Sequence, residues 1–424
     1  MKLIRLLLLI CCLPLLNGCA SLGKGMMEAV LEQKKEDTRL CQIKGKPFEG
    51  LFPMVKDPTK TAKVLMVHGV GSHIPGYSTQ LLEGLSAEMK LDHISEITKN
   101  IEIKESTITD ENPDPKKLGN LRITRSTNKD KSHELIFYEL TWSEITNDQK
   151  RILTYDNSGE YSYRRAAINN VLKKFMNDTA PDPMLYLGDL QEAILISFAQ
   201  SFCWMVSTKW DDLPVTTDQA CDASQLLNAI EDMKKDRYAF ISHSLGSRIV
   251  IDGLQRIVAK LSDKTNVKKN LIEGDKFIKT FQQLQFPIFM LSNQLPMLQL
   301  GRKLPDVTGE RAAYCRADGA HYDLRRVSKA SIIAFSDPND ILSYALPDGF
   351  IEQYIDSRLC AESTNININV AAVIDAFGID MANPLEAHIA YETDDRVLAM
   401  LANGVGNENT SPLVNERCRI LITD

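Results

Sequence analysis

Short apolar runs alternate along this chain with longer segments whose apolar residues recur every three or four positions. Residues 62–67 (A-K-V-L-M-V) predict a buried strand, because the run is short, apolar and contains β-branched side chains. Similar runs predict strands at residues 237–242, 286–291, 331–335 and 366–374. Strands that alternate with helices indicate an α/β fold, in which helices cover both faces of a mostly parallel sheet.

Helices are predicted directly after two of these strands. Ser78 is the expected N-cap of a helix in which the apolar residues from Leu81 to Met89 recur at helical spacing. Residues 247–258 (S-R-I-V-I-D-G-L-Q-R-I-V) predict a second helix. In sheets of this kind functional groups lie at the carboxyl ends of the strands. The residues that follow each strand are therefore the candidates for chemistry.

Two stretches interrupt this alternation. Residues 93–134 are polar and predict a surface excursion, with a hairpin near N-L-R-I-T-R and H-E-L-I-F-Y-E-L-T-W. Residues 143–230 predict mainly helix. Within them, residues 193–206 are nearly all apolar but too short and too interrupted to span a membrane. This segment is expected to be either a core helix or a helix that lines a lid or pocket.

The N-terminus predicts an export signal rather than a part of the fold. Lys2 and Arg5 precede the run L-L-L-L-I-C-C-L-P-L-L, which has the length of a signal-peptide core. The run ends in L-N-G-C, which resembles a bacterial lipobox with Cys19 as the lipidated residue. The alternative is an ordinary signal peptide with a chance cysteine. Ala20 follows the cysteine, which in a Gram-negative bacterium favours the outer membrane.

These features divide the chain into three parts. Residues 1–18 are the expected lipoprotein signal peptide, residues 19–45 a polar tether, and residues 46–424 a single folded domain. We expect the protein to be held at the membrane by its N-terminal lipid and to face the periplasm. The net charge of −7 and the lack of a long basic block argue against nucleic acid as a partner.

Six cysteines would remain in an exported chain after lipidation. An even number in such a chain permits up to three disulfides, in any of fifteen pairings. The spacing C-x-x-C does not occur, which argues against a zinc or redox motif. The six residues are Cys41, Cys203, Cys221, Cys315, Cys360 and Cys418.

The sequence S-H-S-L-G stands between the strand at 237–242 and the helix that follows it. A strand, a turn with serine between small residues, and a helix form the pattern of a nucleophile elbow, which exposes the serine hydroxyl above the sheet. Ser244 is therefore the candidate nucleophile, and Gly246 is the second small residue of the motif. Ser242 stands where the usual motif has its first glycine, and His243 is expected to be an exposed or packing neighbour.

A serine hydroxyl needs a base, and the elbow architecture places an acid and a histidine later in the chain. Asp340, in the stretch S-D-P-N-D after a predicted strand, is the expected acid. Asp337 is its competitor, and an Asp-rich turn without a chemical role is the alternative. His388 follows the last predicted strand and is the expected base, which takes the serine proton and returns it to the leaving group.

A place for a developing oxyanion is predicted after the strand at 62–67. There His68, Gly69 and Gly71 form a supporting turn whose glycines let backbone N–H groups approach a reacting carbonyl. The expected donors are the backbone N–H groups of Val70 and Leu245. A tight strand–helix turn is the structural alternative, and it is compatible with this role.

Together these motifs resemble the α/β-hydrolase superfamily. H-G-V-G, S-H-S-L-G, S-D-P-N-D and E-A-H-I-A-Y occur in family order, and the match covers roughly residues 60–405. Within the superfamily the combination is similar to lipases and esterases, including the GPI inositol-deacylase-like group. The resemblance implies that Ser244, Asp340 and His388 hydrolyse carboxylic esters through an acyl-enzyme, without a cofactor. It also implies that residues 143–230 form a helical cap over the site.

The lipid tether and the apolar segment in the expected cap both favour a lipid or other small acyl ester as substrate. Acyl transfer to an acceptor other than water would use the same residues. A non-catalytic binding lipoprotein on a hydrolase scaffold is an alternative of a different class, and the complete Ser, Asp and His set argues against it. A metal site would need His321 and Asp323 together with His68 or His73, and that spacing is weak.

Overall fold

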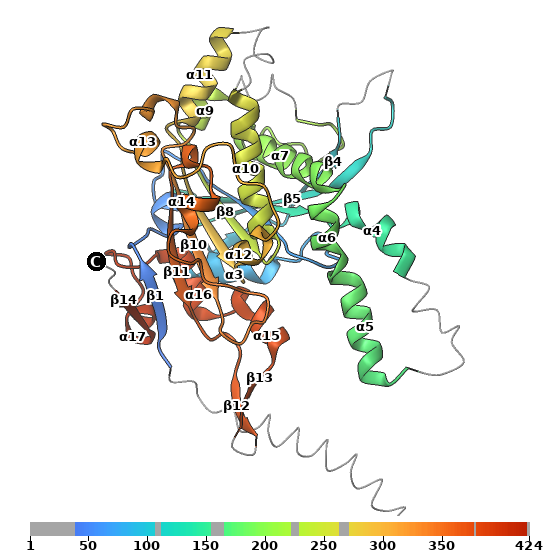
Figure 1. The fold of residues 1–424 in the computed structure, drawn as a ribbon. Helices are drawn as coiled ribbons and strands as arrows, with labels where there is room; N and C mark the ends of the chain where they lie inside the picture. The colour runs from blue at the N-terminus through green and yellow to red at the C-terminus, as the bar shows by residue number, and fades with distance from the viewer. Residues whose placement is uncertain are drawn as a thin grey trace, which may run out of the picture.

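The computed structural model of the chain describes residues 39–106, 112–153, 165–221, 229–262, 271–376 and 379–421. Within these residues a twelve-stranded mixed sheet forms the centre, and helices pack on both of its faces (Figure 1). The central strands run parallel, whereas antiparallel neighbours occur toward both ends of the sheet. The predicted α/β class with a mostly parallel sheet is confirmed.

Strand β8 (Arg237–His243), which directly precedes the candidate nucleophile Ser244, lies in the middle of this sheet. A further strand, β3 (His93–Ile94), pairs with β5, and β12 (Val373–Ala376) and β13 (Ile379–Ala382) form a separate hairpin. The order across the main sheet is β14 (Cys418–Leu421), β1 (Cys41–Gly45), β11 (Ala361–Asn367), β10 (Lys329–Ser336), β9 (Gln285–Leu291), β8 (Arg237–His243), β2 (Ala62–Val67), β6 (Glu134–Thr141), β5 (Lys117–Thr127), β4 (Lys99–Lys104) and β7 (Thr216–Thr217).

The helices divide into a layer on each face of the sheet and a further group around these layers. One face carries α7 (Gln191–Ser207), α9 (Ile230–Met233), α10 (Gly246–Ser262), α11 (Leu271–Phe281) and α12 (Leu295–Gln299). The other face carries α2 (Phe52–Val55), α3 (Thr79–Glu88), α16 (Asp395–Asn403) and α17 (Pro412–Arg417). The remaining helices are α4 (Glu144–Lys150), α5 (Ala167–Thr179), α6 (Pro181–Leu187), α13 (Arg311–Cys315), α14 (Phe350–Tyr354) and α15 (Pro384–Ile389).

Strand β2 shows why its sequence is apolar at every position except Lys63. Successive side chains of a strand point to opposite faces of the sheet. Leu65 and Val67 therefore belong to the hydrophobic core under α7 and α10, while Val64 and Met66 belong to the core under α3 and α16. All four side chains are completely buried, as expected for a central parallel strand that helices cover on both sides.

Most of the predicted elements are confirmed. The strand at residues 62–67 is β2, those at 237–242 and 286–291 are β8 and β9, and the one at 331–335 lies within β10. The helix predicted after Ser78 is α3. The Ser78 hydroxyl does not cap α3 but donates to the buried Glu139 carboxylate.

The surface excursion predicted for residues 93–134 is wrong. Strands β4 and β5 of this stretch extend the central sheet beyond β6, and Leu121 and Ile123 of β5 are completely buried. The predicted hairpin itself is present as the antiparallel pair β5–β6. Polar residues that alternate with apolar ones along β5 gave the stretch its surface-like composition.

The strand predicted at residues 366–374 is also wrong in extent. The parallel neighbour of β10 is β11, which ends at Asn367, and β12 belongs to the hairpin that projects from the body of the molecule (Figure 1). The sequence of β11, A-E-S-T-N-I-N, is largely polar, and only Ala361, Thr364 and Ile366 of this strand are buried. A search for apolar runs therefore missed most of this strand.

Helix α7 is a core helix, as one of the two interpretations of residues 193–206 proposed. Phe198 and Phe202 stack on Phe240 of β8 at ring-centroid distances of 5.9 and 6.0 Å. An added Cβ atom on Gly253 of α10 would lie 2.2 Å from Phe198, so the glycine lets α10 pack closely on α7. A cap role for residues 143–230 stays a prediction. No helix in the described part of the chain is long and apolar enough to cross a membrane.

Three disulfides join the six cysteines expected in the exported chain: Cys41–Cys418, Cys203–Cys221 and Cys315–Cys360. The first links β1 to β14 at the edge of the sheet, where these two residues are also register partners. Strand β1 therefore belongs to the folded body, although residues up to 45 were expected in the tether. The signal peptide and Cys19 lie outside the described residues.

Candidate active site

Ser244 lies at the sharp turn between β8 and α10. Its φ of 54° is in the left-handed region, which residues other than glycine seldom adopt. The Ser244 N–H donates to the Leu291 carbonyl at 2.9 Å, which fixes the turn against the neighbouring strand. An added Cβ atom on Gly246 would lie 2.2 Å from the Val67 carbonyl oxygen, so only glycine fits there. The expected need for small residues around Ser244 is confirmed.

The Ser244 hydroxyl is buried against the glycine turn. The residue is completely buried, and its Oγ has no hydrogen-bond partner among the described residues. An added Cβ atom on Gly69 would lie 2.6 Å from the Ser244 Cβ and 3.1 Å from its Oγ. The absence of a side chain at Gly69 thus lets the backbone of this turn contact the serine.

Asp340 and His388 form a hydrogen-bonded pair at the same end of the sheet. The His388 Nδ1 lies 3.0 and 3.1 Å from the two Asp340 carboxylate oxygens. Asp340 follows β10, as the sequence indicated, and His388 lies on α15, a short helix that the sequence did not predict. Burial raises the pKa of Asp340, but hydrogen bonds from His388 and Ser292 outweigh it and leave the pKa below its ordinary value. The carboxylate is therefore charged at neutral pH and can stabilise a protonated imidazole.

The competitor Asp337 has a different set of partners. Its carboxylate accepts the backbone N–H groups of Val370 at 2.7 Å and Ala371 at 3.1 Å, and that of Asn339 at 2.7 Å. These bonds fix the loops after β10 and β11. The structure therefore brings Asp340, and not Asp337, to His388.

Ser292 is a site residue that the sequence reasoning missed. Its hydroxyl donates to Asp340 Oδ2 at 2.6 Å, and its Oγ lies 2.9 Å from His388 Nδ1. The residue is completely buried and has a φ of 50°. A serine directly after the apolar run of β9 was the only signal in the sequence, and it belongs to no motif.

His243 connects the elbow to α15. Its Nε2–H donates to the backbone carbonyl of His388 at 2.7 Å, and the two rings meet edge to face with centroids 5.0 Å apart. Burial, with a smaller contribution from the neighbouring His388, lowers the pKa of His243 to about 3, so the ring is neutral. His243 is thus more than the packing neighbour that was expected, because it ties the residue beside Ser244 to His388.

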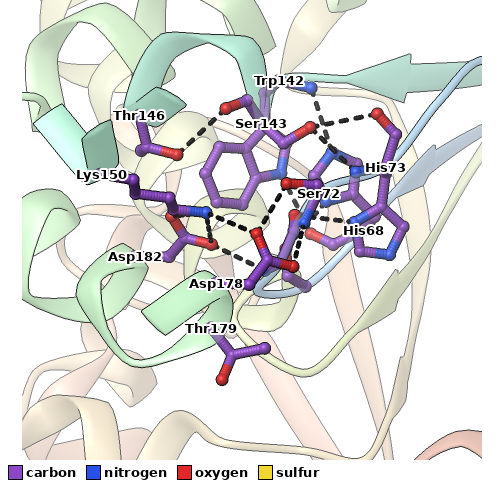
Figure 2. A network of polar contacts seen from close by, with 12 residues as sticks. His68, Ser72, His73, Trp142, Ser143, Thr146, Lys150, Asp178, Thr179 and Asp182 are labelled. Carbon is purple, nitrogen blue, oxygen red and sulfur yellow. Dashed lines mark hydrogen bonds and ion pairs between the residues drawn. The ribbon is translucent and has the colours of Figure 1, made fainter. Parts of the chain in front are cut away.

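The N–H groups of the glycine turn divide into two sets. The Gly71 N–H donates to Asp182 Oδ2 at 2.7 Å, and the Ser72 N–H donates to Asp178 Oδ2 at 3.0 Å (Figure 2). In the described part of the chain, the N–H groups of Val70 and Leu245 donate to no protein acceptor. These two are the donors that the sequence predicted for an oxyanion.

The anchor of the glycine turn is a buried ion pair from the helices beyond the sheet. Asp182 of α6 is completely buried, and its carboxylate lies 2.7 Å from the ammonium group of Lys150, at the end of α4. Figure 2 shows both carboxylates and the lysine gathered on one side of the turn. Helices α4 to α6 therefore determine where the turn lies relative to Ser244.

His68 supports the same turn through contacts with the turn backbone and with two neighbouring aromatic rings. Its ring is stacked between Trp142 and His73, at centroid distances of 4.7 and 4.0 Å. His68 Nδ1 contacts the Gly69 carbonyl at 2.8 Å, and Nε2 accepts the Trp142 N–H at 3.1 Å. Burial lowers the pKa of His68 well below its ordinary value, so this ring is neutral and holds the turn rather than exchanging protons.

In the described residues, no group of three or more His, Cys, Asp or Glu side chains is arranged to hold a metal ion. His321 instead contacts Tyr314, with ring centroids 5.1 Å apart. No protein-family model, curated protein or solved structure matches this chain.

Proposed function

We propose that this protein is a serine hydrolase of the α/β-hydrolase type that cleaves carboxylic esters through an acyl-enzyme. The observation that carries the proposal is the convergence of three features at one end of the sheet. Ser244 is held in a left-handed turn, its hydroxyl has no hydrogen-bond partner among the described residues, and its neighbour His243 is bonded to His388 of the Asp340–His388 pair. Strained residues of this kind are concentrated at functional sites.

In the proposed reaction, the Ser244 oxygen attacks the ester carbonyl carbon while His388 Nε2 accepts the hydroxyl proton. The tetrahedral intermediate collapses when the alcohol leaves with the proton from His388. Water then attacks the acyl-enzyme, and His388 again takes and returns a proton. The backbone N–H groups of Val70 and Leu245 stabilise the oxyanion in both steps, and Asp340 stabilises the charged imidazole.

Two rearrangements are part of this proposal. The Ser244 hydroxyl must turn toward the His388 ring, and hydrogen bonds between nucleophile and base are often long before a substrate binds. Because Ser244 is completely buried, a cover must also move, and we assign that role to α4–α6. The surface of helix α5 is consistent with a lipid or other acyl ester as the substrate, because four of its apolar side chains are exposed: Val171, Leu172, Phe175 and Met176.

The proposal includes the location of the protein. Lipidation at Cys19 and anchorage to the outer membrane on its periplasmic side rest on the sequence L-N-G-C-A. The three disulfides support an oxidising compartment such as the periplasm.

A fluorophosphonate probe tests the chemistry, because it reacts with an activated serine. We expect the purified, disulfide-intact protein to be labelled, and labelling to be lost in Ser244→Ala and in His388→Ala. Ser247→Ala is the matched control, because Ser247 is equally buried, lies in the first turn of the helix that follows Ser244, and its hydroxyl also has no partner among the described residues. Labelling that persists in Ser244→Ala would refute the assignment of the nucleophile. A folded wild type that fails to label would favour a binding protein.

A further inference from the structure

A second buried polar cluster lies along α10, where this helix contacts α6 and α12. Its centre is Asp252, whose carboxylate accepts three bonds of 2.6 Å, from Arg248 Nη2, Arg302 Nη2 and the Tyr186 hydroxyl. Gln299 accepts a further bond from Arg248 Nη1 at 2.9 Å. None of these side chains belongs to the Ser244 site.

The cluster has more positive charge and more donors than its own residues satisfy. Two guanidinium groups face one carboxylate, which leaves one positive charge without a counter-ion among these side chains. Arg248 is 2% exposed, yet its Nε has no acceptor among the described residues. The Nε and Nη1 atoms of Arg302 also have none. Buried donors and charges of this kind are costly unless a partner satisfies them.

We propose that Arg248 and Arg302 form a binding site for a phosphate group. The unsatisfied donors are three N–H-bearing nitrogens on two planar guanidinium groups, and a phosphate offers several anionic oxygens to such donors at once. Its negative charge balances the excess positive charge that Asp252 leaves. The site requires arginine side chains, because a lysine presents a point charge without the planar arrangement of donors that a guanidinium group has.

A phosphate group can reach this cluster from the surface. Arg302 belongs to the loop that follows α12, and its side chain is 16% exposed. Its neighbours Leu300 and Leu304 are 77% and 53% exposed, and Gly301, with a φ of 71°, provides the turn. A shift of this loop alone would open the donors of Arg302 to solvent.

The position of the site indicates how it relates to the proposed reaction. Asp252 is six residues beyond Gly246, the first residue of α10 after the Ser244 turn, which is about 9 Å along a helix axis. An ester whose phosphate group is several bonds from the scissile carbonyl would span this separation. We therefore infer that the substrate class is esters that carry a phosphate group, and this step rests on the proposed function.

Inorganic phosphate tests the site without any reliance on catalysis. At constant ionic strength, with chloride as the reference, we expect phosphate to raise the Tm of the wild-type chain. The apparent Kd should be at least tenfold weaker in Arg302→Gln. Arg358→Gln is the matched control, because Arg358 is 15% exposed and has its own carboxylate partner, Asp356. A wild type indifferent to phosphate, or an Arg302→Gln protein that responds like the control, would overturn the site.

Hydrolysis of two esters then tests the substrate class. We expect Arg302→Gln to lower kcat/KM at least tenfold for a 4-nitrophenyl ester whose acyl chain ends in a phosphate group. The value for 4-nitrophenyl butyrate should stay within twofold. If phosphate stabilises the protein but both esters respond alike, the ligand is free phosphate and the substrate inference is wrong. Phosphate binding without fluorophosphonate labelling would refute the hydrolase but support the site. Arg302→Lys, which keeps the charge, replaces Arg302→Gln should that variant not fold, and the same losses are expected.

Discussion

The carboxylate of Asp182 accepts the backbone N–H of Gly71 at 2.7 Å, across a separation of 111 positions in the sequence. This single bond connects α6 to the turn that packs against Ser244. The same carboxylate neutralises the buried Lys150, so one side chain both balances a charge and positions a backbone segment of the candidate site.

Removal of the Asp182 charge should therefore lower the stability of the folded protein. Asp182→Asn leaves the Lys150 ammonium group buried without a full counter-charge, and we expect it to lower the free energy of unfolding by about 3 kcal/mol. Urea denaturation measures this change. Asp178→Asn is the control, because the Asp178 side chain is 43% exposed and its loss should cost about 1 kcal/mol or less. Equal losses in the two variants would contradict the buried pair.

A paired substitution separates stability from positioning. Lys150→Met combined with Asp182→Leu removes both charges, and we expect it to recover most of the stability, since apolar residues often replace a buried ion pair without loss. The Gly71 N–H nevertheless stays without its acceptor. Fluorophosphonate labelling should therefore remain slower than in the wild type although the protein is stable. Full recovery of labelling would show that the bond to Gly71 does not position the turn.

The two candidate acids should respond in opposite ways to the same substitution. Asp340→Asn places a neutral amide beside His388 and should lower the rate of ester hydrolysis by about 10³–10⁴-fold with a small effect on stability. Asp337→Asn should lower stability by about 1–3 kcal/mol, since its carboxylate binds buried backbone N–H groups, and should leave the rate within a few-fold. Steady-state kinetics and urea denaturation of both variants test this. The reverse pattern would make Asp337 the acid.

Ser292 should contribute to ester hydrolysis through the hydrogen bond that its hydroxyl donates to Asp340. Ser292→Ala removes the bond to Asp340, and we expect a loss of about tenfold in kcat/KM, the equivalent of one hydrogen bond. Ser292→Gly removes the same bond but relieves the left-handed backbone, so it should be about 1 kcal/mol more stable than Ser292→Ala at equal activity. Activity that differs between the two variants would assign the effect to backbone strain and not to the hydroxyl.

Glu392 should make the protein less stable as the pH rises. Burial, with a further contribution from Glu139, raises the pKa of Glu392 from 4.5 to about 7. The folded state therefore retains a proton that the unfolded chain releases between pH 4.5 and 7. In this window the stability due to Glu392 falls by about 1.4 kcal/mol per pH unit.

The variant Glu392→Gln removes this dependence. We expect it to be more stable than the wild type at pH 8, by about 3 kcal/mol at most, and equal to it at pH 4. Chemical denaturation at both pH values measures the difference. Glu352→Gln, at an exposed position, is the control and should show no gain at either pH. A gain for Glu392→Gln that is the same at pH 4 and pH 8 would refute the explanation.

The parts of the fold that sequence reasoning predicted are those whose local pattern matches their final surroundings. Strands such as β2 and β8 are covered on both faces, so their sequences are mainly apolar. The turn at Ser244 was visible because its small residues are a local steric requirement. Strands β5 and β11 were missed or misplaced, since their polar residues pair or face outward only once the sheet has formed.

The residues of the candidate site likewise divide into those that a local sequence pattern predicts and those that depend on contacts between distant segments. Asp340 and Asp337 lie in one turn, and only a contact with the distant His388 distinguishes them. Ser292 carries no motif, and its contacts with Asp340 and His388 depend on where β9 and β10 end and where α15 packs. The network of Lys150, Asp178 and Asp182 joins helices to the glycine turn and leaves no periodic trace in the sequence.

The disulfide between Cys41 and Cys418 has a consequence for the chain as a whole. It joins strands near the two ends of the described chain, so the polypeptide between them is a covalent ring with a sequence separation of 377. A single backbone cut within that ring would leave both fragments attached to each other. A force applied between the N-terminal and C-terminal ends of the chain would pass from Cys41 to Cys418 through the bond, and the strands that lie between these cysteines in the sequence would not bear the load.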